Sequence, residues 1–145
     1  MKKILCLALV LLAAFGCLTS CNFTQTMSGL KDNAESTPKV EEMITALAEK
    51  RTTDAKALMH PQITNDLNSS LSQMSNYLNG RKASSMELIN INITTSTGTS
   101  GKALQEQVAY KVTLNDGAVI YLNTVYLSNN AGSGFVSFQL VLGIV

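Results

Sequence analysis

The chain has 145 residues, of which 46% are hydrophobic and 14% are charged, and its formal net charge at pH 7 is +1. This length is typical of a single domain. The near-neutral charge excludes nucleic acid as a partner, because proteins that bind nucleic acid need a basic face to contact its phosphates. A single histidine excludes a metal site built on several imidazoles, and the sequence predicts neither a metal nor a cofactor.

The first twenty residues have the pattern of an export signal. Lys2 and Lys3 come before an apolar run from Ile4 to Phe15, and small residues follow. A charged start, an apolar run and a small-residue cleavage site are the three parts of a secretory signal peptide. The apolar run is shorter than the roughly 20 residues that a membrane-spanning helix needs. We therefore expect residues 1–20 to be a signal peptide rather than a stable anchor.

Leu18, Thr19, Ser20 and Cys21 close this segment, and the tetrapeptide LTSC resembles the lipobox of bacterial lipoproteins. The resemblance implies that the Cys21 thiol receives a diacylglyceryl group and that signal peptidase II cuts just before it. Two or more acyl chains hold a protein stably on a membrane, whereas one does not. We expect a lipid-anchored, extracytoplasmic protein of the bacterial cell envelope. The alternative is an ordinary secretory signal that is cleaved at a nearby small residue.

The cysteine count fits the lipoprotein interpretation. Cys6 and Cys17 lie inside the predicted signal, so a chain that begins at Cys21 contains no other thiol. This excludes a disulfide framework and a catalytic cysteine. Without Lys2 and Lys3, nine basic residues are left against ten acidic ones. Residues 21–37 comprise the lipidated cysteine and a polar stretch without periodicity, which predicts a flexible tether. Residues 38–145 are then one domain.

The first half of this domain has helical periodicity. Thr37 and Pro38 are typical of a helix cap and a first-turn residue, and an apolar stripe follows at Val40, Met43, Ile44, Leu47 and Ala48. We expect a second, short helix over 54–59, which His60-Pro61 ends. A third helix is predicted over 61–79, with Gly80 as its left-handed cap.

In the second half the period changes to two. Alternating apolar residues predict strands over 89–94 and 108–114, joined by the Gly-, Ser- and Thr-rich residues 97–102. Asn115-Asp116-Gly117 is a hairpin turn signal that leads into further strands over 118–127 and 135–144. The last two strands are apolar on both faces in places, and we expect them to be the central pair. The fold class is therefore α+β, with N-terminal helices packed on a curved four-stranded antiparallel meander.

This order of elements resembles the nuclear transport factor two-like, or cystatin-like, superfamily of small cone-shaped domains. The likeness rests on VEEMITALAEK, on TTDAKALMHPQI and on the strands QVAYKVTL, AVIYLNTVYL and GFVSFQLVLG, and it covers most of residues 38–145. The superfamily includes ketosteroid isomerase, scytalone dehydratase and many bacterial envelope lipoproteins of unknown function. The full superfamily pattern has a short hairpin between the second and third long helices, for which this chain has no room. The resemblance therefore points to the smaller lipoprotein version.

Candidate site residues are few. His60 could centre a catalytic triad or simply end a helix, and no acidic pair is clustered with it. Tyr121 and Tyr126 have opposite parity and should point to opposite faces of their strand. If a pocket exists, we expect it between the third helix and the concave sheet face, lined by Met59, Met74, Tyr77, Tyr110, Val112 and Tyr126. These residues could equally be core.

Two classes of function follow from these residues. The first is a membrane-tethered, non-catalytic binding or interaction module for a small amphipathic ligand or an envelope protein. The second is a small pocket enzyme of the isomerase or dehydratase kind, in which a buried acid and a tyrosine act on a bound substrate. The single histidine and the lack of a carboxylate pair favour the first class and predict no catalytic residue.

Overall fold

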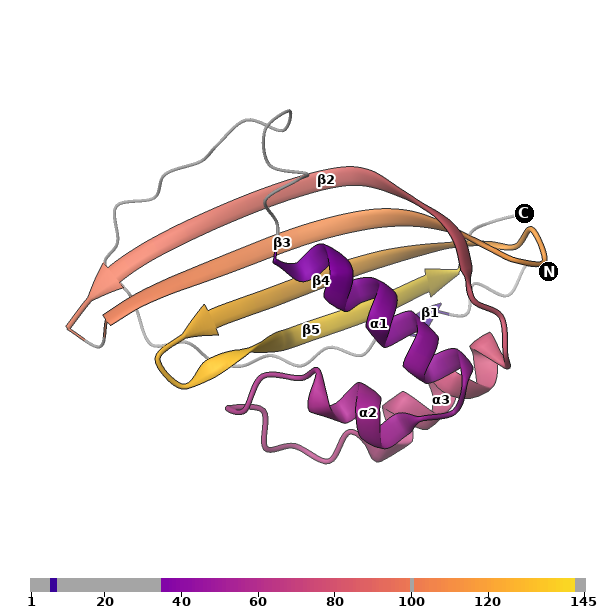
Figure 1. The fold of residues 1–145 in the computed structure, drawn as a ribbon, viewed down its shortest axis with the longest axis horizontal. Coiled ribbons are helices and arrows are strands. Elements are labelled where there is room, and N and C mark those ends of the chain that lie inside the picture. Colours follow the sequence, from indigo (N-terminus) through magenta and orange to yellow (C-terminus); the bar gives the residue numbers. More distant parts are fainter. Residues whose placement is uncertain (1–5, 8–34, 100, 143–145) are drawn as a thin grey trace.

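The computed structural model describes residues 6–7, 35–99 and 101–142. Three helices, α1 (Ser36–Ala48), α2 (Thr52–Ala57) and α3 (Asn68–Leu78), precede four long strands in the chain. The helices lie against one side of a single sheet (Figure 1). The α+β class, with helices followed by an antiparallel four-stranded meander, is confirmed.

The long strands are β2 (Ala83–Gly98), β3 (Gly101–Leu114), β4 (Val119–Asn129) and β5 (Gly132–Leu142). Each pairs antiparallel with the next, and the two-residue β1 (Cys6–Leu7) completes the order β1-β5-β4-β3-β2. The expectation that the last two strands form the central pair is wrong, because β3 and β4 are the inner strands of the meander. Among the described residues, β5 pairs on its other side with the short β1, and Phe135 forms an isolated bridge with Met59.

Because of two irregularities in strand pairing, simple alternation along β2 and β5 does not give the face of the sheet on which each side chain lies. The pairing of β5 with β4 shifts between Phe135 and Ser137, so Val136 is an extra residue, and both Phe135 and Phe138 lie in the core. The pairing of β2 with β3 shifts between Leu88 and Asn90. Ile89 is the extra residue there and is 46% exposed, whereas Ile91 is buried. A bulge moves the residues on its two sides into opposite parity.

Helix α1 packs along the sheet through the predicted apolar stripe, since Val40, Met43, Ile44, Leu47 and Ala48 are all buried. The predicted cap is wrong. Glu35 occupies the N-cap position, no side-chain cap bond is formed there, and Thr37 lies inside the helix. The reason is tertiary: a carboxylate from the sheet accepts hydrogen bonds from the first backbone amides, so no local cap is needed.

The other two helices differ from their predicted bounds. α2 begins at Thr52 rather than Asp54 and ends at Ala57, and α3 begins at Asn68 rather than Pro61. Residues 61–67 are not helical because His60 N–H donates to Phe135 O, which ties this part of the chain to β5. The Asp66 carboxylate then accepts the Asn68 N–H at 3.0 Å, at the start of α3. At the other end, Asn79 and Gly80 both adopt positive φ, so the predicted left-handed cap takes two residues.

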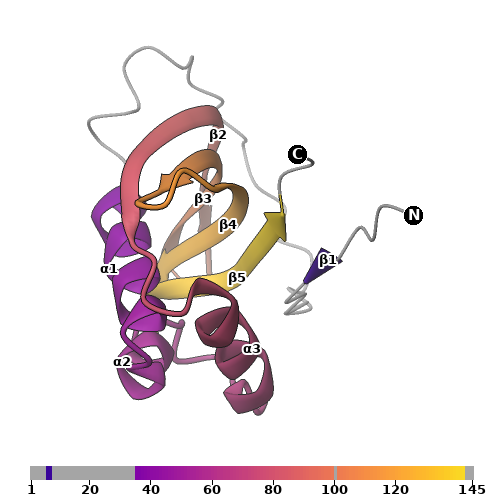
Figure 2. The ribbon, with the colours of Figure 1, turned by 90° about the vertical axis from the view of Figure 1, so that its right-hand side faces the viewer.

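The strands run farther than the alternation predicted. β2 and β3 pair as far as Gly98 and Gly101, so most of the expected connection over 97–102 belongs to the hairpin. The predicted turn at Asn115-Asp116-Gly117 is confirmed: Gly117 has a φ of 87°, and Leu114 N–H bonds to Ala118 O. The long strands are strongly curved, and β2 arches above β3 and β4, with α1 beside the sheet (Figure 2).

A single hydrophobic core fills the space between the helices and the concave sheet face. All of its members among the described residues fall between Val40 and Leu142. The predictions for residues 1–37, which include the lipobox and the lipidation of Cys21, concern residues that lie almost entirely outside the described ones. The exceptions are residues 35–37 and β1, which pairs antiparallel with β5 through Cys6↔Val141 and Leu7↔Leu140.

Candidate functional site

The residues predicted to line a pocket come together, but they do so inside the core. Met59, Met74, Tyr110, Val112 and Tyr126 are each at most 6% exposed, and Tyr77 is half-buried against them. The opposite facing of two tyrosines is confirmed, since Tyr121 is 37% exposed and Tyr126 is buried. Their role in binding a ligand stays a prediction.

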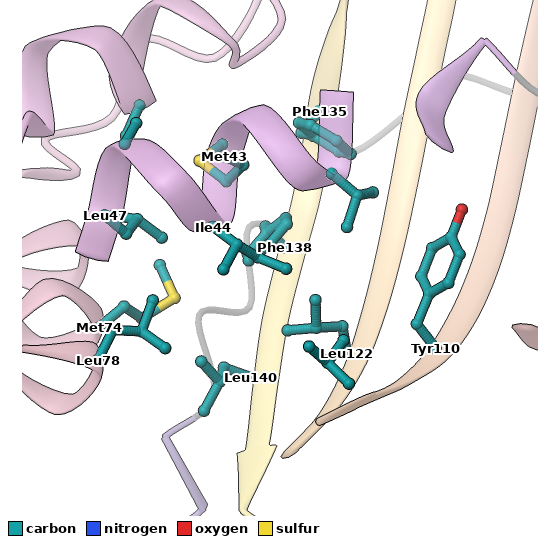
Figure 3. Close-up of a cluster of buried hydrophobic side chains, with 14 of the residues drawn as sticks. Met43, Ile44, Leu47, Met74, Leu78, Tyr110, Leu122, Phe135, Phe138 and Leu140 are labelled. Carbon is teal, nitrogen blue, oxygen red and sulfur yellow. The ribbon is translucent and has the colours of Figure 1, made fainter. Parts of the chain in front are cut away.

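Aromatic rings fill the region beneath α1. Phe135 packs edge-to-face on Tyr126 with 5.1 Å between ring centroids, and on Phe138 with 5.4 Å. Figure 3 shows Met43 and Ile44 of α1 pointing towards Phe135 and Phe138 of β5, with Leu122 and Leu140 completing the cluster. Such edge-to-face contacts are favourable beyond simple burial of area. A ligand that entered this region would have to displace a ring.

A buried carboxylate lies where α1 begins. Glu106 of β3 is 1% exposed, and its Oε1 and Oε2 accept the backbone N–H groups of Glu35 and Ser36, each at 3.0 Å. The first amides of a helix have no partner within the helix and carry partial positive charge, so a carboxylate is well placed there. Glu106 is not among the site residues that the sequence predicts. Its parity was the available signal, because Glu106 alternates in step with the buried Val108, Tyr110 and Val112.

Tyr110 lies two inward positions farther along β3, beyond the buried Val108. Its hydroxyl is 3.0 Å from Thr37 Oγ1, so the side chain of Thr37 serves this contact instead of a helix cap. Burial raises the pKa of the Tyr110 hydroxyl above its ordinary value, and the hydrogen bond with Thr37 opposes that rise. The neutral phenol is therefore the form that the fold holds. Together, Glu106 and Tyr110 attach the start of α1 to the sheet.

His60 makes a second polar contact between the helical layer and the sheet. Gln62 N–H donates to Nδ1 at 3.1 Å, so the ring proton is on Nε2, which lies 3.1 Å from both Asn129 Oδ1 and Gly132 O. The ring is 1% exposed and every nitrogen has a partner. His60 therefore holds the turn between β4 and β5 rather than presenting a free nitrogen to a substrate.

The backbone approaches closely at the same place. His60 N–H donates to Phe135 O and Phe135 N–H donates to Leu58 O, both at 2.9 Å, which forms a short parallel bridge beside β5. A Cβ added to Gly134 would lie 2.5 Å from His60 N and 2.6 Å from the Met59 carbonyl carbon. Only glycine allows the two segments to meet at this distance.

A shallow pocket opens elsewhere, between α1 and the start of β2. Its volume is about 160 Å³, and its lining is Glu41, Thr45, Ala83, Ser84, Ser85 and Met86. Pockets that hold drug-sized ligands enclose roughly 300–1,000 Å³. This one is small, polar and open. None of its lining residues is among the site residues that the sequence predicts.

Two features are absent from the described part of the chain. Within residues 6–7, 35–99 and 101–142, no three His, Cys, Asp or Glu side chains are grouped so that they could hold a metal ion. Over the same ranges, no helix has the length and apolar character needed to cross a bilayer. No protein family, curated protein or solved structure matches this chain in comparisons.

Proposed function

We propose that this chain is a bacterial lipoprotein, anchored through Cys21 on the outside of the cytoplasm, whose domain is a non-catalytic interaction module for an envelope protein. The anchor is supported by the charged start, the short apolar run and the LTSC sequence in front of Cys21. Loss of residues 1–20 would take no member of the described core with it, because that core falls between Val40 and Leu142.

The non-catalytic role rests mainly on how the buried polar groups are used. The side chains of Glu106, His60, Ser75 and Thr124 hydrogen-bond to the protein's own backbone. Ser36 differs, since its backbone N–H donates to Glu106 while its hydroxyl has no partner among the described residues. A general acid or base needs an open path to a substrate proton. These groups are committed to holding the fold together.

An envelope protein fits this domain better than a small amphipathic ligand. The space beneath α1 is occupied by the rings of Tyr126, Phe135 and Phe138. The large apolar side chains that are exposed in the described part of the chain, Ile89 and Tyr121, belong to strands of the sheet. Tyrosine is enriched at protein interfaces, where its ring is apolar and its hydroxyl stays wet. The small-ligand module and the pocket enzyme would both require the core to open.

We also propose that the fold is the cone-shaped, cystatin-like arrangement of the nuclear transport factor two-like superfamily in its smaller form. Support comes from the order of helices before a meander and from the curvature of the sheet around α1 (Figure 2). Function does not follow from a shared fold, so this likeness supplies no substrate.

Metabolic labelling with palmitate tests the anchor. The parent chain and Cys17→Ser should both be labelled and found in the membrane fraction, because Cys17 lies in the predicted signal. Cys21→Ser should lose the label, because Cys21 is the cysteine of the predicted lipobox and a serine in its place cannot form the thioether bond to the lipid. Labelling of Cys21→Ser at the parent level would show that the lipoprotein proposal is wrong.

A further inference from the structure

The outer edge of β5 accepts an extended segment at each of its two ends. At the start of the strand, Phe135 bonds through both its N–H and its C=O to the chain at Leu58 and His60. Near the end, Leu140 and Val141 pair antiparallel with β1. Figure 2 shows β1 on the side of β5 that faces away from β4. The outer edge of β5 can therefore form backbone hydrogen bonds with another extended segment. At the C-terminal end of β5, the segment that pairs with it, β1, is antiparallel.

β1 belongs to the predicted signal peptide, so this inference rests on the proposed function. Cleavage before Cys21 would remove Cys6 and Leu7 and leave the backbone groups of Leu140 and Val141 without that partner. Unpaired edges that are apolar and uncharged pair readily with other strands, and proteins usually protect them with charges, prolines or bulges. β5 contains no charged residue and no proline between Gly132 and Leu142. Its single irregularity is the bulge at Val136.

We propose that in the mature protein the β5 edge pairs antiparallel with the β5 edge of a second copy of this chain. The regular stretch between the bulge at Val136 and the last strand residue Leu142 is Ser137–Val141, with Gln139 at its centre. A two-fold axis at Gln139 places Phe138 opposite Leu140 of the other copy. It also places Gln139 of one copy opposite Gln139 of the other. Core-facing side chains of the two copies are then neighbours, and the two Gln139 side-chain amides face each other.

The self-complementary pattern favours a second copy over an unrelated strand. An antiparallel pair about a two-fold axis needs the same stretch to match itself when read in the opposite direction. Ser137–Val141 does so, because its apolar core-facing residues are symmetric about Gln139. Like charges directly opposite one another would destabilise such a pair, and this stretch has none.

The opposite edge of the sheet is β2, and it is neither uncharged nor regular in its pairing. β2 carries the charged side chain of Glu87, and its pairing shifts at two places, next to Ser84 and at Ile89. Bulges twist an edge away from flat pairing. No other described strand pairs with β2 on its outer side. The two edges are therefore not equivalent, and β5 is the one suited to a second copy.

Cysteine crosslinking tests both the pairing and its register. Residues directly opposite each other in an antiparallel pair have Cα atoms about 4.5–5.5 Å apart, within the range that a disulfide spans. Gln139→Cys should therefore crosslink to itself, in envelope membranes under mild oxidation, as a dimer on non-reducing gels. Ser137→Cys is the matched control: its copy would lie about 13 Å away along the strand, and it should stay monomeric.

The same two variants in a chain that begins at Asn22 separate this inference from the anchor. That chain has no natural cysteine and no signal, so its result does not depend on lipidation. A Gln139→Cys protein that melts like its parent and stays monomeric would overturn the pairing, whatever the palmitate result. Equal crosslinking of Ser137→Cys, or a membrane crosslink to a different protein, would also overturn it. Gln139→Lys should abolish the dimer in sedimentation, because two ammonium groups would face each other across the pair, while its circular dichroism spectrum stays that of the folded parent.

Discussion

The helical layer is attached to the sheet at two places by opposite means. At the start of α1, the sheet supplies a charged group, and Glu106 accepts two backbone amides. At the turn between β4 and β5, the helical layer supplies a neutral ring, and His60 donates to Gly132 O while accepting from Gln62 N–H. In both cases a buried titratable side chain satisfies backbone groups that no regular helix or strand satisfies.

This difference shows why neither residue could be assigned from its type alone. A lone histidine and a lone glutamate both suggest acid-base chemistry, yet each is committed to backbone groups of the fold. The two attachments should also fail differently. The His60 attachment depends on close backbone approach, whereas the Glu106 attachment depends on a side-chain charge next to a helix end.

Among substitutions at the two attachments, the largest effect is expected from Gly134→Ala. The new methyl group would meet the backbone of Met59 and His60 at 2.5–2.7 Å, so the bridge to Phe135 would have to open. Overpacking of this kind costs about 3 kcal/mol in free energy of unfolding. Chemical denaturation followed by circular dichroism measures it, with the exposed neighbour Ser133→Ala as control. Parent-like stability of Gly134→Ala would contradict the close approach.

A smaller loss is expected from Glu106→Gln. The amide keeps the shape of the side chain but turns one acceptor into a donor that faces a backbone N–H, which should cost about 2 kcal/mol. Glu87→Gln is the matched control, because its carboxylate on β2 is largely exposed. Amide hydrogen exchange should show faster exchange at the start of α1 in Glu106→Gln. If both variants lost equal stability, Glu106 would have no special role.

The smallest effect concerns Tyr110→Phe and appears as a change in pH dependence. Because burial raises the folded-state pKa of Tyr110 above its ordinary value of 10.0, stability from the neutral phenol is present below pH 10 and is lost as the pH rises further. Tyr110→Phe should lose about 1 kcal/mol at pH 7 through the Thr37 contact. Its melting temperature should then fall less steeply than the parent's above pH 10. Parallel profiles would contradict the assignment.

Sequence patterns predicted the parts of this fold that depend on local periodicity. The buried stripe of α1, the change from helix to strand period and the turn at Asn115-Asp116-Gly117 all follow from side-chain spacing. Helix 61–79 was overextended because Ile63 and Leu67 fit a helical stripe, while the bond from His60 N–H to Phe135 O is invisible in the sequence. The same holds for the sheet-supplied cap of α1.

Bulges set a second limit. Alternation predicted Ile89 and Ile91 on one face, but an extra residue in the pairing exposes Ile89. In β5, the extra residue Val136 lets Phe135 and Phe138 both enter the core, which is why that strand reads as apolar on both faces. Three of the residues predicted to line a pocket, Met59, Met74 and Tyr126, belong to one buried cluster, and their role in binding a ligand stays a prediction. Their parity could not tell a lined cavity from a filled core.

The measurement that tests the filled-core account most directly is made on Tyr126→Ala. Tyr126 is 6% exposed and packs on Phe135, so removal of its ring should cost about 3–5 kcal/mol in free energy of unfolding. Tyr121→Ala, on the exposed face of the same strand, should cost far less. Native mass spectrometry of the same proteins should show no change in co-purifying molecules. A loss below about 1 kcal/mol, together with disappearance of a bound small molecule, would contradict the account and restore a pocket beneath α1.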